Sequence, residues 1–416
     1  MRLSDDEQAV AAGAAGPARA TAMRVVAEAA RLLGAERLVP IASAHVDGCL
    51  YHGDCAVAFI EGLVRDGGRV VVPTTLNVGA LDLLNPKRVK GDAHFREMAA
   101  RLMQAHVALR CQPSWTCAPY QAGHRPKMGD HVAWGESNAV AFVNSVLGAR
   151  TNRCGDFLDI CAALAGRAPY CGLHLDANRK ARVLVDTSPL SIRLKEIDAF
   201  YPVLGAWLGA ELGGTVAAIE GLPRDVSEDR LKALGAGAAS TGSVGLFHVV
   251  GVTPEAPDVA AACGGDNPER VIKLSPEGLR AARESLSTTR GERIDVIAIG
   301  SPHFSSAEFA ALIPLVTGKR FRVPFYVCTS RAALEPLKAA GRIRALEQAG
   351  VTIIVDTCIV VAPILPPGGG VLMTNSAKFA HYGPARTGYE VVYGSLEDCV
   401  ASAASGALSR DESLWQ

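Results

Sequence analysis

The chain has 416 residues, more than one ordinary hydrophobic core needs, so we expect two or three packed units. Lys and Arg together number 42, as do Asp and Glu, and the resulting net charge of zero gives no general attraction to nucleic acid or anionic lipid. Charged residues at 20% and hydrophobic residues at 49% exclude a disordered protein. The composition therefore indicates a folded globular protein with no nucleic-acid partner.

The N-terminal apolar stretch, residues 9–33, is interrupted by charged side chains and lacks the uncharged core of a secretion signal. The longest apolar strings, such as Ile359–Leu365, are too short to cross a bilayer. We therefore expect a cytoplasmic protein that does not enter a membrane. Its 11 Cys are then expected to be mostly thiols that serve the core, a metal or catalysis.

Hydrophobic periodicity predicts helices and strands that alternate along most of the chain. In chain order, we expect a helix at Gln8–Leu33, a strand at Arg37–Ala44, a helix at Asp54–Arg65, a strand at Arg69–Pro73, helices at His94–Val107, Ser137–Leu147, Gly155–Leu164 and Leu194–Leu208, a strand at Thr215–Ile219, a helix at Glu228–Leu234, a strand at Gly245–Val250, a helix at Pro276–Ser285, a strand at Asp295–Ile299, a helix at Ser306–Val316, a strand at Pro324–Cys328, a helix at Arg331–Ala349 and a strand at Val351–Val355. Strands separated by helices predict parallel sheets. The Gly- and Pro-rich segments Gly235–Gly245 and Pro363–Gly370 are expected to be domain edges or site loops.

The segment from His45 to Cys55 gathers two His, two Cys and two Asp directly after a predicted strand. Because parallel sheets bind ligands beyond the carboxyl ends of their strands, we interpret this segment, with the turn at Thr74–Gly79, as a substrate-binding region. A zinc site is a second interpretation, although the spacing lacks the paired short intervals of structural zinc sites. Its ligands would be His45, Cys49, His52 and Cys55. A third interpretation makes Cys49 and Cys55 ordinary buried thiols.

Three further cysteines stand where a metal ligand or nucleophile is expected. Cys117 lies in the string WTCAPY, whose proline and aromatic residues predict a rigid loop. Cys328 ends one predicted strand and Cys358 follows another, so both are expected at the carboxyl edge of a parallel sheet. Cys111 is left undecided. We interpret five others, which lack supporting polar neighbours, as structural: Cys154, Cys161, Cys171, Cys263 and Cys399.

Near the C-terminus, Asn375, Ser376 and Lys378 lie at the start of a predicted helix. Free backbone N–H groups and a cation at a helix start favour a bound carboxylate or phosphate. The alternative is a capping serine beside a solvated lysine. The glycines of the segment Gly235–Gly245 lack the spacing of a dinucleotide-binding fingerprint, so we expect no nicotinamide cofactor.

Several motifs taken together resemble one family. In order they are AHVDG (44–48), VPTTLNV (72–78), WTCAPYQ (115–121), ESNAV (136–140), NSVLGART (144–151), DTC (356–358) and TNSAK (374–378). This order is similar to the catalytic large part of aconitase X and covers nearly the whole chain. The resemblance implies an α/β fold, namely an aconitase-like, multi-domain, three-layer α/β/α architecture with mainly parallel sheets. We place region boundaries at 1–210, with the substrate turns and the WTCAPY loop, 211–290, and 291–416, with the TNSAK motif and the two later cysteines.

The resemblance implies an iron–sulfur hydro-lyase in which three thiolates hold the cluster and one iron position is open to substrate. Cys117 and Cys358 match the family's ligand motifs, and we choose Cys328 as the third ligand, with Cys111 as its alternative. The type of cluster is not readable from the sequence. The same resemblance indicates which residues line the substrate: Gly48, Cys49, Leu50, Asn77, Val78, Ser376 and Lys378.

Dehydration of a 3-hydroxy acid removes a weakly acidic proton beside a carboxylate and expels hydroxide, so it needs a Lewis acid and a base. Thiolate ligands suit iron–sulfur chemistry. His45 and Asp47 are local candidates for proton handling or substrate orientation. The resemblance places the main base, a serine, on a swivelling small domain. Because the chain ends at Gln416 without such a domain, we expect a separate small partner subunit.

Two small-molecule hydroxy acids fit the resemblance, cis-3-hydroxy-L-proline and mevalonate 5-phosphate. We favour hydroxyproline, with Δ1-pyrroline-2-carboxylate as product, because Asp47 can pair with a ring amine and no dense Lys/Arg cluster accompanies its turn. Leu50 also stands where we expect phosphomevalonate-specific members to carry a small hydroxyl residue. The alternative of another class is a non-catalytic zinc- or iron-binding sensor built on the segment from His45 to Cys55.

Overall fold

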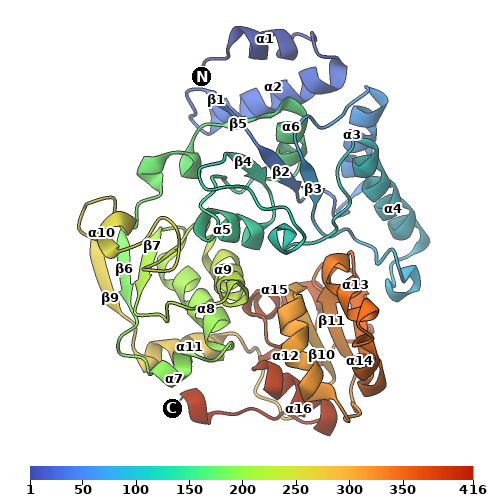
Figure 1. Ribbon diagram of the computed structural model, residues 1–416. Helices are drawn as coiled ribbons and strands as arrows, with labels where there is room; N and C mark the ends of the chain where they lie inside the picture. Colours follow the sequence, from blue (N-terminus) through green and yellow to red (C-terminus); the bar gives the residue numbers. More distant parts are fainter. Residues whose placement is uncertain (416) are drawn as a thin grey trace.

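The computed structural model describes residues 1–415, which form an α/β structure (Figure 1). The helices are α1 (Asp5–Ala11), α2 (Pro17–Leu32), α3 (Asp54–Arg65), α4 (Ala93–Ala108), α5 (Ser137–Ser145), α6 (Leu158–Ala165), α7 (Ile192–Lys195), α8 (Phe200–Leu212), α9 (Glu228–Gly242), α10 (Val259–Ala262), α11 (Pro276–Ser285), α12 (Ser306–Val316), α13 (Arg331–Ala339), α14 (Ile343–Ala349), α15 (Ala377–Thr387) and α16 (Leu396–Ser405). The strands are β1 (Leu38–Pro40), β2 (Ser43–Val46), β3 (Thr74–Leu76), β4 (Val132–Trp134), β5 (Arg167–Pro169), β6 (Val183–Asp186), β7 (Ala217–Glu220), β8 (His248–Val249), β9 (Arg270–Lys273), β10 (Val296–Phe304), β11 (Phe325–Thr329), β12 (Val351–Val355), β13 (Val371–Thr374) and β14 (Glu390–Tyr393). None of these helices is long and apolar enough to span a lipid bilayer.

Three parallel sheets organise the described chain. Their strand orders are β3-β2-β4, β8-β7-β6-β9 and β12-β11-β10-β13-β14. We name the parts built around them the N-terminal, middle and C-terminal regions. A short antiparallel pair, β1 with β5, adds a second sheet to the N-terminal region. The predicted α/β class with mainly parallel sheets is confirmed.

The three regions surround a central pair of helices (Figure 1). The N-terminal region lies at the top of the view, the middle region at the lower left and the C-terminal region at the lower right. Helices α8 and α9 of the middle region pack against each other between them, and α9 also contacts α5 above and α15 beside it. Helix α9 therefore touches all three regions.

Glycine allows the close approach of α8 and α9. A Cβ atom added at Gly205 would lie 2.1 Å from the carbonyl oxygen of Leu234, and one at Gly242 would lie 2.0 Å from that of Gly209. The segment Gly235–Gly245 was predicted to be a domain edge or site loop, and this prediction is wrong, since most of it lies inside α9. Its glycines serve a helix–helix contact that the sequence alone does not reveal.

Three predicted helices are each divided in the structure. The one at Leu194–Leu208 is divided between α7 and α8 at residues 196–199. Residues 8–33 form α1 and α2, because Gly13 and Gly16 adopt left-handed φ angles of 110° and 90° and Pro17 then begins a new helix. The predicted helix at Arg331–Ala349 is broken between α13 and α14, where Gly341 has a φ of 66°. Glycine with positive φ interrupts a helical pattern that apolar spacing alone predicts as continuous.

The strand positions also differ from the prediction in places. The predicted strand at Arg37–Ala44 is divided between β1 and β2, which belong to different sheets. The one at Arg69–Pro73 is displaced onto β3, which nevertheless pairs in parallel with β2 as expected. The predicted boundary between residues 210 and 211 falls between β6 and β7, which pair along their whole length. We therefore propose region boundaries near residues 180 and 290, so that each region keeps its parallel sheet intact.

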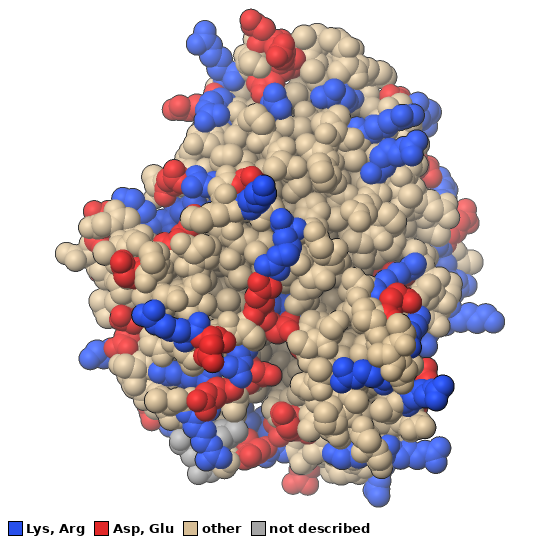
Figure 2. Space-filling view, in the orientation of Figure 1, with Lys and Arg blue, Asp and Glu red and all other residues tan. Residues whose placement is uncertain are grey.

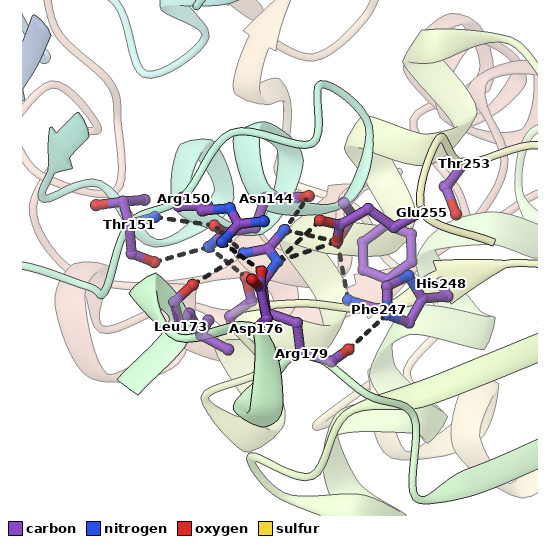
Figure 3. A network of polar contacts seen from close by, with 12 residues as sticks. Asn144, Arg150, Thr151, Leu173, Asp176, Arg179, Phe247, His248, Thr253 and Glu255 are labelled. Atoms are coloured by element: carbon purple, nitrogen blue, oxygen red, sulfur yellow. Dashed lines mark hydrogen bonds and ion pairs between the residues drawn. The ribbon is translucent and has the colours of Figure 1, made fainter. Parts of the chain in front are cut away.

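A buried arginine fixes the connection between the N-terminal and middle regions (Figure 3). The Arg179 side chain is 4% exposed, and its Nε and Nη2 atoms donate to the Glu255 carboxylate at 3.0 and 2.8 Å. Its Nη1 atom donates to Asn144 Oδ1 at 3.1 Å, and Nη2 donates to the Asn144 carbonyl oxygen at 3.0 Å. Asn144 Oδ1 also accepts the backbone N–H of Thr151 at 3.0 Å. Arg179 thus ties the end of α5 to the loop that carries Glu255.

We expect Arg179→Met to lower the free energy of unfolding by about 3 kcal/mol, because it leaves the Glu255 carboxylate and the Asn144 carbonyl without their partner. The matched control is Arg182→Met, whose similar two-bond pair with Glu269 is exposed. Urea unfolding of both variants and the wild type measures the difference. Equal unfolding midpoints for the two variants would contradict a stabilising role for the buried network.

Candidate active site

Strand ends from two sheets face each other between the N-terminal and C-terminal regions. Asp47 and Asn77 come directly after β2 and β3, and Glu136 is the second residue after β4. Cys328 lies near the end of β11, and Lys378 lies in the first turn of α15, just beyond β13. Carboxyl ends of parallel strands are where open α/β sheets bind their ligands. The predicted substrate turns and the TNSAK motif therefore meet in one place.

A hydrogen-bonded polar wall joins the two sheet edges. Lys378 Nζ donates to the Glu136 carboxylate and to Asn138 Oδ1, the latter at 2.7 Å. The Nδ2 group of Asn77 donates to Asp47 Oδ1 and, at 3.0 Å, to Glu136 Oε2. Every side chain in this wall is thereby held by at least one neighbour, and the wall crosses from one region to the other.

The two carboxylates of the wall carry different charges near neutral pH. Burial and, second to it, the nearby Glu136 charge together raise the pKa of Asp47 to about 7. Burial would also raise the pKa of Glu136, but the ion pair with Lys378 outweighs burial and lowers that pKa to about 2. The same ion pair raises the pKa of Lys378. Glu136 is thus ionised, while Asp47 can hold or release a proton.

Asp159, which the sequence analysis did not single out, supports the substrate turn from behind. Its carboxylate is fully buried and accepts the backbone N–H groups of Asp47 at 2.6 Å and Gly48 at 3.3 Å. Burial raises its pKa to about 7, although the backbone N–H bonds act in the opposite direction. An Asp within an otherwise apolar helical segment was the available signal, but its partners are over 100 residues away along the chain.

The three predicted metal ligands are buried, and they lie close enough to one another for their charges to interact. Cys117, Cys328 and Cys358 are 5%, 1% and 5% exposed. The thiols of Cys328 and Cys358 interact directly, which raises the pKa of Cys328 and lowers that of Cys358 to about 7. Burial raises the pKa of Cys117 to about 12, and the charge of Lys378 acts against this rise. Cys358 is therefore the thiol that most readily becomes a thiolate.

Local hydrogen bonds hold the two cysteine loops. The backbone N–H of Thr116 donates to the Leu76 carbonyl at 3.2 Å, and Asn138 Nδ2 donates to the Cys117 carbonyl at 2.8 Å. Beyond β12, Asp356 adopts a left-handed φ of 63° and accepts two bonds from Arg331, which aims the chain toward the site. Residues of strands and helices therefore hold both cysteine loops in place.

The other predicted residues occupy varied positions. Cys49 is buried, and its thiol donates to the Asn77 carbonyl at 3.3 Å, so it supports the turn from inside. Leu50 is half-buried and Val78 is 4% exposed. Ser376 caps α15, because its Oγ accepts the N–H of Phe379 at 3.0 Å, and its hydroxyl donates to the Ser301 carbonyl. Ser376 thus caps the helix, as in the alternative interpretation, whereas Lys378 contacts the wall.

The proposed zinc ligands do not assemble into a site. His45 is fully buried, and its Nδ1 lies 2.9 Å from Thr75 Oγ1, whereas His52 and Cys55 are exposed. Burial lowers the pKa of His45 to about 3, so this imidazole is neutral. Among residues 1–415, no group of three or more His, Cys, Asp or Glu side chains is placed to hold a metal ion. The structure therefore gives no support to a zinc site in this turn.

The three buried thiols suit a cluster better than a single ion. A cluster distributes its thiolate ligands over more than one iron, so the sulfur atoms need not converge on one point. Backbone N–H groups of Ile359 and Val360 and the Ser301 hydroxyl interact with the sulfur atoms of Cys328 and Cys358, as donors to cluster thiolates do. Cys111, the alternative ligand, lies near Cys49 and Asp159 instead. The donor set fits an iron–sulfur cluster.

Two buried acceptors in the site have no hydrogen-bond partner among the described residues, Asn77 Oδ1 and Thr357 Oγ1. Buried polar groups are rarely left unpaired, so these atoms indicate a place for a bound polar molecule. A cavity of about 560 Å³ lies between α9, α12, α15 and α16 and reaches the site at Ser301 and Ser376. Figure 2 shows a hollow in this part of the surface, edged by Asp and Glu side chains.

The fold and this site define an α/β enzyme with buried thiols beside a carboxylate-lined wall. Three family models match the chain: aconitase X first domain at residues 1–177, second domain at 181–284 and third domain at 294–405. The chain belongs to the aconitase X family, as the motifs predicted. A crystal structure of Thermococcus kodakaraensis aconitase X in its holo form matches it with a TM-score of 0.87 at 36% identity, over 97% of this chain and 100% of that one.

Two relatives indicate the class of reaction. The chain is 45% identical over 419 residues to cis-3-hydroxy-L-proline dehydratase of Pseudomonas aeruginosa, covering 100% of this chain and 72% of that protein. It is 38% identical over 386 residues to the phosphomevalonate dehydratase large subunit of Thermococcus kodakarensis, covering 92% of this chain and 95% of that subunit. The chain is therefore a dehydratase, that is, a hydro-lyase, which confirms the predicted enzyme class.

Asp159→Asn should become more stable relative to the wild type as pH rises from about 5 to about 7. The native state keeps the Asp159 proton up to about pH 7, whereas an unfolded Asp releases it near 3.8. Between these values the native state binds more protons than the unfolded state, so wild-type stability falls with rising pH by at most about 1.4 kcal/mol per pH unit. The Asn side chain keeps the oxygen that accepts the turn's N–H groups and removes this loss.

Urea unfolding at the two pH values measures the effect, with Asp66→Asn at an exposed site at the end of α3 as the control. The difference between Asp159→Asn and the wild type should grow with pH, and that of the control should stay constant. A pH-independent difference for Asp159→Asn would show that Asp159 is ionised in the folded protein throughout this range.

Proposed function

We propose that this protein dehydrates cis-3-hydroxy-L-proline to Δ1-pyrroline-2-carboxylate. The observation that carries the proposal is the charge of the substrate wall, in which Asp47 and Glu136 face buried thiols. The cations beside them are already paired, Lys378 with Glu136 and Arg331 with Asp356. A wall of this kind suits a substrate with an amine better than one with a phosphate dianion, which requires available Lys or Arg groups. The higher identity to the hydroxyproline enzyme supports the same choice.

We propose that Cys117, Cys328 and Cys358 hold an iron–sulfur cluster whose type the sequence leaves open. When bound, a cluster with an open iron position supplies a Lewis acid that stabilises the departing hydroxide. The chain's contribution is to keep this place dry and to orient the substrate. Half-buried Leu50 and buried Val78 exclude water at the turn, and Asn77 Oδ1 is free to accept a hydrogen bond from the substrate.

Proton handling falls to the turn after β2 and to a partner. The reaction removes the proton at C2 and the hydroxyl at C3 as water, and the resulting enamine tautomerises to the cyclic imine. Asp47, with a pKa of about 7, can orient the ring amine or hold a proton at its carboxylate. His45 is neutral and therefore does not carry a charge in the reaction. Its Nε2 atom has no partner in the described structure and can form a hydrogen bond to a group near Asp47. We propose that the remaining lining residues are Gly48, Cys49 and Ser376.

We propose that the main base lies on a small swivel-domain subunit that pairs with this chain. The Thermococcus kodakarensis relative is itself a large subunit, and the Pseudomonas aeruginosa relative is longer than the part that this chain matches. The opening between the middle and C-terminal regions gives such a domain access to the site. We further propose a cytoplasmic location, which suits free thiols and an oxygen-sensitive cofactor.

Proton NMR of anaerobically prepared, iron-reconstituted protein with cis-3-hydroxy-L-proline tests the substrate. The proposal predicts loss of the C3 carbinol signal and appearance of the pyrroline product in the presence of the small subunit. The trans isomer is the stereochemical control, and mevalonate 5-phosphate is tested in parallel. Turnover of the phosphate compound with persistence of hydroxyproline would contradict the proposed substrate but not the enzyme class.

Serine substitution separates the proposed ligands from other buried cysteines. We expect Cys117→Ser, Cys328→Ser and Cys358→Ser each to lose most iron and all but about 1% of activity, because each removes a thiolate from the cluster. Cys399→Ser, at a buried cysteine in α16, is the matched control and should keep both. Metal analysis and activity assays make the comparison. Full iron content in Cys358→Ser with loss of iron in Cys111→Ser would overturn the ligand assignment.

A further inference from the structure

His303, in β10, lies between the two loops that carry Cys117 and Cys358. Its side chain is 1% exposed. The ring Nδ1 lies 3.1 Å from the hydroxyl oxygen of Thr116, which precedes Cys117, and Nε2 lies 3.1 Å from the carbonyl oxygen of Thr357, which precedes Cys358. One imidazole therefore bridges a loop of the N-terminal region and a loop of the C-terminal region.

The partners fix the protonation of this ring. A carbonyl oxygen only accepts hydrogen bonds, so the His303 Nε2 atom carries the hydrogen that is donated to Thr357. The Nδ1 atom then accepts the Thr116 hydroxyl. Because both ring nitrogens are used by the protein, neither is free to bind a metal ion. His303 is thus not a ligand, although it lies beside two of the proposed ligands.

The main chain of His303 is also fixed, and it touches sulfur directly. Its backbone N–H donates to Cys117 Sγ at 3.2 Å. Its carbonyl oxygen accepts a bond from Lys232 Nζ at 3.3 Å, and that ammonium group, 1% exposed, is held in turn by Asp229 at 2.8 Å and Glu308 at 2.5 Å. A buried ion-pair network thereby holds the strand that presents the imidazole.

We propose that His303 is a positioning residue that sets the separation and orientation of the Cys117 and Cys358 loops for the cofactor. The proposal rests on the proposed function in taking these cysteines as cluster ligands. It goes beyond that function in assigning the geometry of the ligand set to one neutral imidazole that reaches both loops through Thr116 and Thr357. Outer partners of this kind hold ligands in place, and their loss commonly weakens metal binding by about 10- to 100-fold.

The first test uses the protein without cofactor, so that it does not depend on the cluster. Alkylation by iodoacetamide, followed residue by residue with mass spectrometry, reports how often each buried thiol becomes accessible. In His303→Phe we expect Cys117 and Cys358 to react about tenfold faster than in the wild type. Loss of one or two hydrogen bonds makes local opening of the loops more frequent by about this factor. Cys399 serves as an internal control whose rate should stay unchanged.

The second test uses the reconstituted protein. The rate at which a chelator removes iron, and the electron paramagnetic resonance spectrum of the cluster, are compared among the variants. We expect iron release to be about 10-fold faster or more in His303→Phe and intermediate in Thr116→Val, which removes only the hydroxyl donor. His303→Gln, whose amide N–H can still donate to the Thr357 carbonyl, should lie closer to the wild type.

The matched control is His106→Phe, which removes another fully buried histidine, in α4, bonded to the Leu102 carbonyl at 2.9 Å. It should leave thiol reactivity and iron release unchanged. Wild-type rates for both cysteines and for iron release in a folded His303→Phe, or in His303→Gln and Thr116→Val if the Phe variant does not fold, would overturn the proposal. If the wild type takes up no cluster but His303→Phe is alkylated faster, the positioning role is supported and the proposed cofactor is contradicted.

Discussion

The buried ion pair between Glu136 and Lys378 is the interaction on which the site depends. It joins the edge of the N-terminal sheet, beyond β4, to the start of α15 in the C-terminal region. Loss of one partner of a buried pair typically costs about 3–5 kcal/mol, so the two sheet edges are held together strongly. The pair also decides the charges around it, because Lys378 keeps Glu136 ionised and Glu136 in turn raises the pKa of Asp47. Structure and proton affinity thus come from the same contact.

The arrangement separates two tasks in space. The N-terminal region supplies oxygen and amide groups that can orient a polar substrate, and Asp159 holds their turn through backbone bonds. The C-terminal region supplies two of the three thiols, at neighbouring strands of one parallel sheet. Cys117 belongs to the N-terminal region but contacts the C-terminal one, because its sulfur accepts the backbone N–H of His303. A dehydratase needs both tasks at one carbon–carbon bond, and the facing sheet edges provide that proximity.

Local sequence signals predicted much of this structure, and contacts between distant segments account for the rest. The bounds of α11, α12 and β12 agree with the prediction, because caps or turns enclose a clear apolar period there. The places of Cys328 and Cys358 at the carboxyl edge of one sheet followed from the strand pattern. The inclusion of Cys117 and Lys378 in the same site rested on the family resemblance. The glycines of α9 were misread because helix packing, not a turn, requires them. His303 was missed because its partners are 187 and 54 residues away along the chain, and no local pattern marks them.

The central claim is that a cluster is held between the facing sheet edges by Cys117, Cys328 and Cys358. Anomalous X-ray diffraction at the iron absorption edge, from crystals of the anaerobically reconstituted protein, tests it most directly. The account predicts iron density bounded by the Sγ atoms of these three cysteines, with one iron facing Asp47 and Asn77. Iron bound instead in the turn around His52 and Cys55, or at Cys111, would contradict it.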